Sequence, residues 1–234
     1  MNNRLVRYLW GLRIGIFSNY PSSRLYSRSF AKEIIRKYRY LLFGRLPLLG
    51  RKDSPGETTK AFNRRLKENF FFKYCQGKGI DIGYCGDPIT KTSYVWDFEH
   101  GNAETMNKVQ DSYFDYVYSG HVLEHLPAPS IAIKNWWRIL KEGGYLILYL
   151  PHRDLYEKKE CLPSRFNDDH LHFFMPDSDI APDTIGLRDL IEKELTNSKI
   201  IYIKTCDSGY HNPGDDLPSV GEFSIEAVIQ KIRP

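Results

Sequence analysis

Two stretches of this 234-residue chain decide its fold: residues 114–126, FDYVYSGHVLEHL, and residues 137–148, WRILKEGGYLIL. The first begins with alternating aromatic and charged side chains, and the second leads into the continuous apolar run 145–150. Such a run is typical of a strand that is buried on both faces of a sheet. Between the two strands, residues 130–140 have the pattern of a helix, which the glycine pair of the second stretch would stop.

The rest of the chain continues this alternation of strands and helices. The predicted helices are 58–75, 130–140 and 187–195, and the predicted strands are 78–82, 93–98, 114–118, 145–150, 199–205 and 223–232. Strands that alternate with helices favour a mostly parallel sheet. No helix joins the last two strands, which are therefore expected to form an antiparallel C-terminal hairpin. We predict an α/β fold.

A glycine-rich turn follows the first predicted strand, in residues 79–88, GIDIGYCGDP. A strand that runs into glycines lets the backbone turn sharply and approach a ligand without obstruction by side chains. On its own this turn indicates either a nucleotide site or a purely structural bend.

The glycine turn and the two stretches, taken in order, resemble class I S-adenosylmethionine-dependent methyltransferases over about residues 78–151. A dehydrogenase would not be expected to show the Leu-Glu-His-Leu element of residues 123–126. The resemblance implies a Rossmann-like methyltransferase sheet and S-adenosylmethionine as the cofactor.

The resemblance also implies a cofactor site at the matching positions. Its residues are Asp81, Gly83 and Gly86 at the methionine end, Asp97 or Glu99 at the ribose hydroxyls, Asn102 and Ala103 at the adenine, and His121 beside the sulfonium. A carboxylate suits the ribose because it can accept two hydrogen bonds. The chain departs from the family at Cys85, where many members carry glycine, and at Asn102, which replaces an aspartate and loses its charge.

Only 21 positions separate Asp81 from Asn102, too few for the two helices and the extra strand usual between these motifs. We therefore expect a sheet that is trimmed between strands 1 and 4, with a more open cofactor cleft that residues 1–75 would close. A compact bacterial subset of the family is similar, with Asp-Ile-Gly-x-x-Gly-Asp-Pro and Pro-Ser-x-Phe-Asn-x-Asp-His motifs. That subset is often associated with surface-glycan biosynthesis.

Two polar segments, 151–157 and 163–173, follow the strand 145–150. Ligands bind beyond the carboxyl ends of the strands in open α/β sheets, so these segments should face the acceptor. A hydroxyl acceptor benefits from a histidine base. The candidates are His170 first, oriented by Asp168 or Asp169, then His152 and His121. Alternatively, these are loop histidines that bond to backbone carbonyls.

The same segment raises the question of a metal ion. Its possible ligands are Asp168, Asp169, His170 and His172. Sites rich in histidine favour zinc or iron over magnesium. We expect no metal here.

Charge divides the chain unevenly. Residues 1–73 hold 17 basic and 4 acidic residues, a balance of +13, and the remainder balances at −9. We expect a basic, aromatic extension over residues 1–57 and a methyltransferase domain over 58–234. The extension would meet nucleic acid, a membrane surface through residues 1–50, or the acidic domain itself. No apolar stretch is long enough to span a membrane and the four cysteines are scattered, so a cytoplasmic location is expected, with peripheral membrane association as an alternative.

The expected activity is methyl transfer to a hydroxyl, or less favourably an amine, of a small-molecule or carbohydrate acceptor. One rival is an RNA methyltransferase that uses the basic N-terminal third. This rival is disfavoured because Ser119-Gly120-His121-Val122 stands where amine-methylating nucleic-acid enzymes frequently carry Asn/Asp-Pro-Pro-Tyr. The other rival is a non-catalytic domain that keeps the fold as an interaction module.

Overall fold

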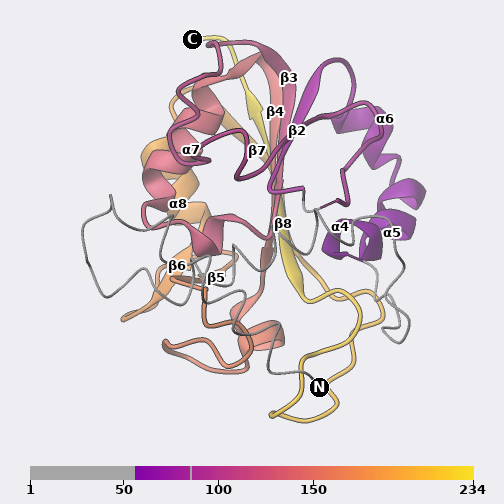
Figure 1. Cartoon of the computed structure of the whole chain (residues 1–234), viewed down its shortest axis with the longest axis vertical. Helices are drawn as coiled ribbons and strands as arrows, with labels where there is room; N and C mark the ends of the chain where they lie inside the picture. The colour runs from indigo at the N-terminus through magenta and orange to yellow at the C-terminus, as the bar shows by residue number, and fades with distance from the viewer. Residues whose placement is uncertain (1–55, 85) are drawn as a thin grey trace, which may run out of the picture. The chain divides into compact units, whose positions relative to one another are not determined.

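The computed structural model describes residues 56–84 and 86–234, and a six-stranded sheet of order β2-β1-β3-β4-β8-β7 forms its centre (Figure 1). The strands are β1 (Gly79–Ile82), β2 (Tyr94–Trp96), β3 (Phe114–Gly120), β4 (Leu140–Pro151), β7 (Ser198–Cys206) and β8 (Ser224–Lys231). β1 to β4 pair in parallel, whereas β8 is antiparallel to both β4 and β7. This confirms the predicted parallel sheet with an antiparallel C-terminal hairpin.

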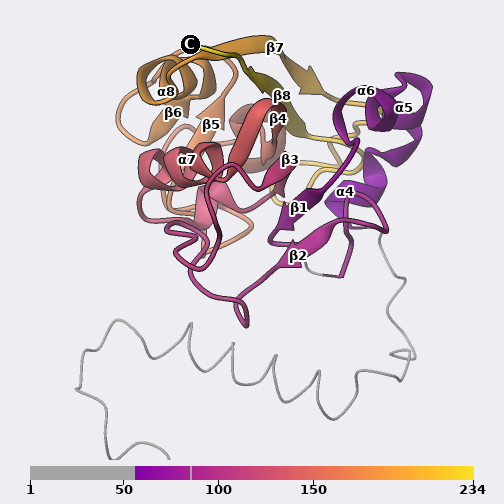
Figure 2. The ribbon, with the colours of Figure 1, turned by 90° about the horizontal axis from the view of Figure 1, so that it is seen from above.

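Helices cover both faces of the sheet (Figure 2). On one face lie α4 (Glu57–Lys60), α5 (Phe62–Lys67) and α6 (Phe70–Tyr74), and on the other lie α7 (Pro129–Arg138) and α8 (Leu187–Glu194). The prediction of one helix over 58–75 was wrong, because Asn69 takes a left-handed conformation with φ of 55° and separates α5 from α6. Asparagine tolerates this conformation better than most residues.

The predicted trimming of the sheet is confirmed. Apart from residue 85, which is not described, the segments 83–93 and 97–113 contain turns but neither a helix nor a strand. β2 is therefore an edge strand that reaches its place beside β1 by turns alone.

The sequence pattern predicted that the glycine pair stops a helix, and this prediction was wrong. α7 ends at Arg138 and β4 already begins at Leu140, so Gly143 and Gly144 lie inside the strand. The position of Gly144 admits no side chain, since a Cβ there would come within 2.6 Å of the Asp115 carbonyl oxygen. The glycine thus allows a close approach of two backbones where the pairing of β3 with β4 shifts register.

A buried ion pair ties α5 to the sheet. Arg65 is fully buried, and its Nε donates to Oε2 of Glu226 in β8 at 2.7 Å. The guanidinium carbon lies 4.6–5.1 Å from the ring centroids of Phe70, Tyr118 and Tyr149. Because the charge is surrounded by aromatic faces, Glu226 is its essential partner.

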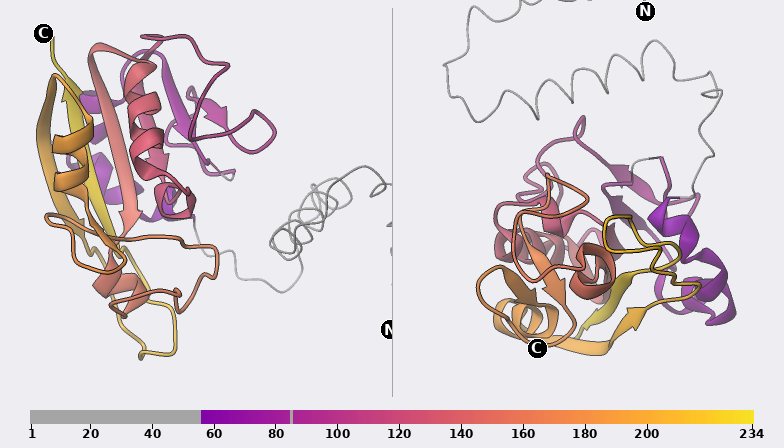
Figure 3. Two further views of the ribbon diagram at one scale, coloured as in Figure 1. Left: turned by 90° about the vertical axis from the view of Figure 1, so that its left-hand side faces the viewer. Right: turned by 90° about the horizontal axis from the view of Figure 1, so that it is seen from below.

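Loops gather at the end of the sheet toward which β4 points (Figure 3). A short π-helical turn, η2 (Arg153–Glu157), follows β4 directly, and β5 (Phe173–Met175) and β6 (Thr184–Gly186) form a separate parallel pair. β7 is parallel to β4, so the loop 207–223 lies at the same end. The sequence prediction included neither η2 nor this second sheet.

Most of the predicted N-terminal extension, residues 1–55, lies outside the described residues. The proposed boundary at 57/58, the contact with a membrane through residues 1–50 and the closure of the cleft by residues 1–75 remain predictions. Among the helices that the structure does describe, none combines the length and the apolar character that crossing a bilayer requires.

Candidate active site

The four parallel strands end at one edge of the sheet and deliver a set of predicted residues to it. Gly83 follows β1, Asp97 follows β2, His121 follows β3 and His152 follows β4. Because β1 lies between β2 and β3, the glycine turn has the carboxylate of Asp97 on one side and His121 on the other. The structure therefore brings these predicted residues to one edge of the sheet.

The glycine turn is open where a ligand would approach. Gly83 and Gly86 have φ of +79° and +88°. A Cβ on Gly83 would come within 2.1 Å of Val122 Cγ2, whereas a Cβ on Gly86 would meet no atom of the described residues within 4 Å. Beside the turn, the backbone N–H and hydroxyl of Thr59 donate to the Asp87 carboxylate at 2.9 and 2.6 Å. α4 thus packs directly on the turn.

Asp81 lies beneath this turn. Its side chain is buried, and Oδ2 accepts the N–H of Ile89 at 2.6 Å, which fixes the far end of the turn to β1. Burial raises the pKa of Asp81 to about 7, and the Ile89 N–H and the positive charge of Arg65 act against that rise. The carboxyl group therefore titrates near neutral pH.

The two carboxylates expected at the ribose differ in environment. Asp97 is half-buried at the end of β2, and its Oδ1 accepts the N–H of Phe98 at 2.8 Å. Glu99 is exposed in the turn that follows. Asp97 is better placed than Glu99 to meet the ribose hydroxyls, because Asp97 directly follows the strand beside the glycine turn.

The adenine pair occupies the next loop. Oδ1 of Asn102 accepts the N–H groups of Glu104 and Thr105 at 2.7 and 3.2 Å, so this oxygen stabilises its own turn. The carbonyl of Ala103 accepts Nε1–H of Trp136 in α7 at 2.8 Å. The loop is thereby tied to the helix that covers this face of the sheet.

His121 connects the cofactor edge with a buried polar cluster. It has a left-handed φ of 54°, and the next residue, Val122, packs against Gly83. Its Nε2 lies 2.9 Å from Ser224 Oγ, and its Nδ1 lies 3.7 Å from Glu124 Oε1. Burial, and after it the neighbouring basic groups, hold the pKa of His121 well below its ordinary value.

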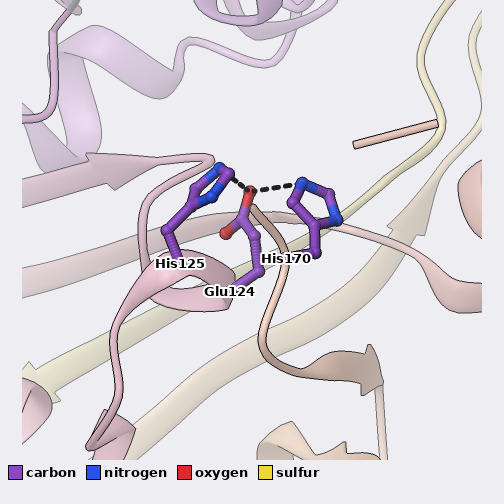
Figure 4. A group of neighbouring side chains, drawn as sticks. All are labelled: Glu124, His125 and His170. Carbon is purple, nitrogen blue, oxygen red and sulfur yellow. Dashed lines mark ion pairs between the residues drawn. The ribbon is translucent and has the colours of Figure 1, made fainter. Parts of the chain in front are cut away.

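Glu124 is the centre of that cluster (Figure 4). It belongs to a single 3-10 turn, η1 (Leu123–His125), and is fully buried. Among the described residues, neither carboxylate oxygen has a hydrogen-bond partner. Nε2 of His125 and Nε2 of His170 lie 3.8 and 4.0 Å from its Oε1. Burial raises the pKa of Glu124 to about 7, against the influence of His170.

His170 is oriented by a residue that the sequence analysis did not choose. Its Nδ1 donates to Oε1 of Glu157 at 2.5 Å, and Ser164 Oγ donates to the other oxygen of that carboxylate. The expectation that Asp168 or Asp169 orients His170 was wrong. Asp168 is exposed, and Asp169 contributes only its carbonyl, which accepts Nδ1–H of His125 at 3.0 Å.

His152 is poorly placed to act as a base. Its Nδ1 accepts the backbone N–H of Asp154 at 3.2 Å, so the neutral ring carries its proton on Nε2. Burial lowers the pKa of His152, as it does that of His121, so the hydrogen bond to Asp154 is what argues against His152. The Nε2–H group of His152 is therefore a hydrogen-bond donor, and the ring has no free lone pair to accept a proton.

Three residues of the cluster were not predicted as functional: Glu124, His125 and Glu157. All three lie in segments whose importance was recognised, in the Leu-Glu-His-Leu element and at the end of segment 151–157. For Glu124 the available signal was a carboxylate directly after the apolar Val122 and Leu123, because carboxylates are seldom buried without a partner.

Comparison with known proteins identifies a family for part of the chain. Residues 59–148 match the family model described as a methyltransferase domain. No curated protein sequence matches the chain. Solved structures with a similar fold include an S-adenosylmethionine-dependent methyltransferase from Thermotoga maritima, which is 18% identical; the match covers 87% of this chain and 98% of the other, with a TM-score of 0.47. Another such methyltransferase, from Archaeoglobus fulgidus, is 15% identical; the match covers 75% of this chain and 94% of the other, with a TM-score of 0.45. A third, from Methanosarcina mazei, is 16% identical; the match covers 70% of this chain and 98% of the other, with a TM-score of 0.44.

The matched domain and the Rossmann-like sheet define a class I methyltransferase fold. Residues 59–148 match a methyltransferase domain, which supports methyltransferase activity with S-adenosylmethionine as the cofactor.

The residues of the glycine turn fit this cofactor. Gly86 leaves open the space that a side chain would fill, and Asp97 offers a half-buried carboxylate at the neighbouring strand end. A bare backbone turn beside a carboxylate is the arrangement that a nucleoside with two ribose hydroxyls requires. Gly83, Gly86 and Asp97 are therefore the residues we expect to hold it.

Proposed function

We propose that the protein transfers the methyl group of S-adenosylmethionine to a hydroxyl, or less favourably an amine, of a small-molecule or carbohydrate acceptor. One observation carries the proposal: a buried cluster of histidines and glutamates adjoins the cofactor edge through His121. A hydroxyl is a weak nucleophile that benefits from a neighbouring base, and histidine is the usual choice.

We assign the proton acceptor to His121, which differs from the order expected from the sequence. Both ring nitrogens of His170 face carboxylates, and its side chain is only 3% exposed. His121 is 17% exposed and follows the strand beside the glycine turn. With Nε2–H donating to Ser224, the lone pair of a neutral ring lies on Nδ1.

S-adenosylmethionine supplies, when bound, an electrophilic methyl group on a sulfonium sulfur. The acceptor oxygen would take this methyl group, and the sulfur would keep the electron pair of the broken carbon–sulfur bond. The hydroxyl proton passes to Nδ1 of His121. The chain contributes chiefly by holding the acceptor in line with the methyl group, since positioning supplies much of the acceleration in such transfers.

Two observations support a carbohydrate acceptor. Tyr156 and Phe166 are half-buried, their ring centroids lie 5.8 Å apart, and Tyr156 also contacts His170. Flat aromatic faces beside a few polar groups are typical of sites for ligands that are apolar on one side and polar on the other. Residues 163–170 also carry the Pro-Ser-x-Phe-Asn-x-Asp-His motif of the bacterial subset associated with surface glycans.

The test is a transfer assay on the full-length protein with S-adenosylmethionine labelled in the methyl group. Free sugars, sugar nucleotides, small amines and RNA are offered in parallel. We expect label in a sugar fraction and a fall of at least about 100-fold in kcat for His121→Asn, the usual loss when a general base is removed. The matched control is His211→Asn, at an exposed position in loop 207–223. Transfer to RNA alone, or an unchanged kcat in His121→Asn, would contradict the proposal.

A further inference from the structure

The cluster around Glu124 has a second property that methyl transfer does not explain. Three side chains each offer one possible metal-ligand atom there: Glu124, His125 and His170. These three atoms all lie within 4.8 Å of one another (Figure 4). They come from two separate segments, the 3-10 turn η1 and the loop before β5. Leu171 N–H donates to the Glu124 carbonyl at 2.8 Å and holds these two segments together.

The hydrogen-bond pattern fixes which ring nitrogens are free. A carbonyl oxygen only accepts, so His125 Nδ1, 3.0 Å from the Asp169 carbonyl, carries the proton. His170 Nδ1 likewise donates to Glu157, because that carboxylate already receives the hydroxyl of Ser164 on its other oxygen. The Nε2 lone pairs of both neutral rings are therefore left for other partners.

Both lone pairs point to the carboxylate of Glu124. That carboxylate is fully buried and lacks a hydrogen-bond donor among the described residues. Three acceptors thus converge, and no donor from the part of the chain that the structure describes lies between them. A buried polar group without a partner costs about 1–3 kcal/mol, and more when it is charged. A proton on one of these groups satisfies a single contact, whereas a cation between them satisfies all three.

We propose that Glu124, His125 and His170 bind a divalent transition-metal ion, with the Nε2 atoms of the two histidines and the glutamate carboxylate as ligands. Two imidazoles and one carboxylate form a ligand set that zinc and iron(II) favour and that magnesium and calcium do not. Glu157 and the Asp169 carbonyl bond to the outer nitrogens of the two rings, which is how the ligating histidines of metal sites are oriented.

The separations need only a small adjustment. The two Nε2···Oε1 distances are 3.8 and 4.0 Å, and ligands about 2.0 Å from a tetrahedral zinc ion lie about 3.3 Å apart. His125 belongs to a single helical turn and His170 to a loop, so a contraction of this size is within the reach of side-chain rotation.

The role of the ion rests on the proposed function. Three protein ligands leave a coordination position open, as in catalytic zinc sites. His121 Nδ1 lies 3.7 Å from the same Glu124 oxygen, so a hydroxyl in the open position would lie beside the assigned base. Coordination makes a bound hydroxyl more acidic. The O–H proton still passes to His121, and the oxygen still attacks the methyl carbon as the carbon–sulfur bond breaks.

The experiment measures metal content directly. Full-length protein, purified without a histidine tag, is stripped with a chelator and titrated with Co²⁺, whose absorption spectrum reports its ligands, and with Zn²⁺. We expect one equivalent of either ion in the wild type and in the control His211→Asn. We expect loss of that equivalent in His125→Asn and His170→Asn, and affinity about 10–100-fold weaker in Glu157→Gln, a positioning residue.

The outcomes separate this proposal from the proposed function. A wild-type protein that binds no ion but transfers methyl groups overturns the metal site alone. Stoichiometric binding that survives in both histidine variants overturns the assigned ligands. Circular dichroism of each variant tests whether it is folded. His125→Asn is the substitution least able to unfold the domain, because 31% of the His125 side chain is exposed.

Discussion

Gly83 and Gly86 offer a matched pair of substitutions in the same turn. Both have positive φ, so alanine at either position costs about 1–2 kcal/mol of backbone strain. Only at Gly83 does the new Cβ also collide with a neighbour, Val122 Cγ2, at 2.1 Å. Such overpacking typically adds about 1–3 kcal/mol. We predict a loss in the free energy of unfolding of roughly 2–5 kcal/mol for Gly83→Ala and of roughly 1–2 kcal/mol for Gly86→Ala.

Urea unfolding of the two variants, and of Gly83→Ala in a Val122→Ala background, separates the cost of backbone strain from the cost of overpacking. Val122→Ala leaves only its Cβ near the added atom, at 3.4 Å, which is an ordinary contact. The cost of Gly83→Ala should then fall to that of Gly86→Ala. Equal losses in the two single variants, or no recovery in the double variant, would refute the packing of Val122 on the glycine turn.

Two further stability predictions concern buried carboxylates. The pKa of Asp81 is about 7 in the folded chain against about 4 unfolded, so its stabilising contribution is complete below about pH 4 and is lost as the pH rises to about 7. Urea titrations should show the wild type losing up to about 4 kcal/mol relative to Asp81→Asn over that range, and parallel curves would exclude the shift. Glu226→Gln should cost about 3–5 kcal/mol, because Arg65 loses its buried counter-charge. The exposed Glu192→Gln should cost less than about 1 kcal/mol, and a similar loss in both would contradict the argument.

The fold was largely predictable because its signals are local. The apolar run of β4 and the strand β1 before Gly83 identify buried strands from their own side chains, and the short segment 83–113 left no room for elements besides β2. The failures have local causes as well. Asn69 breaks a helix whose apolar period continues across it, and Gly144 is required by an approach of backbones that no periodicity reveals.

The site was predictable only at the strand ends. Gly83, Asp97 and His121 follow strands, and parallel strands place their carboxyl ends together whatever the loops do. The partner of His170 depends instead on how the loop after β4 folds. Sequence proximity suggested Asp168 and Asp169, whereas the π-helical turn brings Glu157 to the ring. Such a pairing is set by tertiary contacts and has no signature in spacing.

Calorimetric titration with S-adenosylmethionine and with its demethylated product, S-adenosylhomocysteine, tests the central claim most directly. The structure predicts that both bind the full-length protein with one site. Asp97→Asn should weaken both about 10–100-fold, as loss of a charged hydrogen bond does, with unfolding unchanged. Folded wild-type protein that binds neither compound, with or without an acceptor sugar present, would contradict the assignment of this edge of the sheet as a cofactor site.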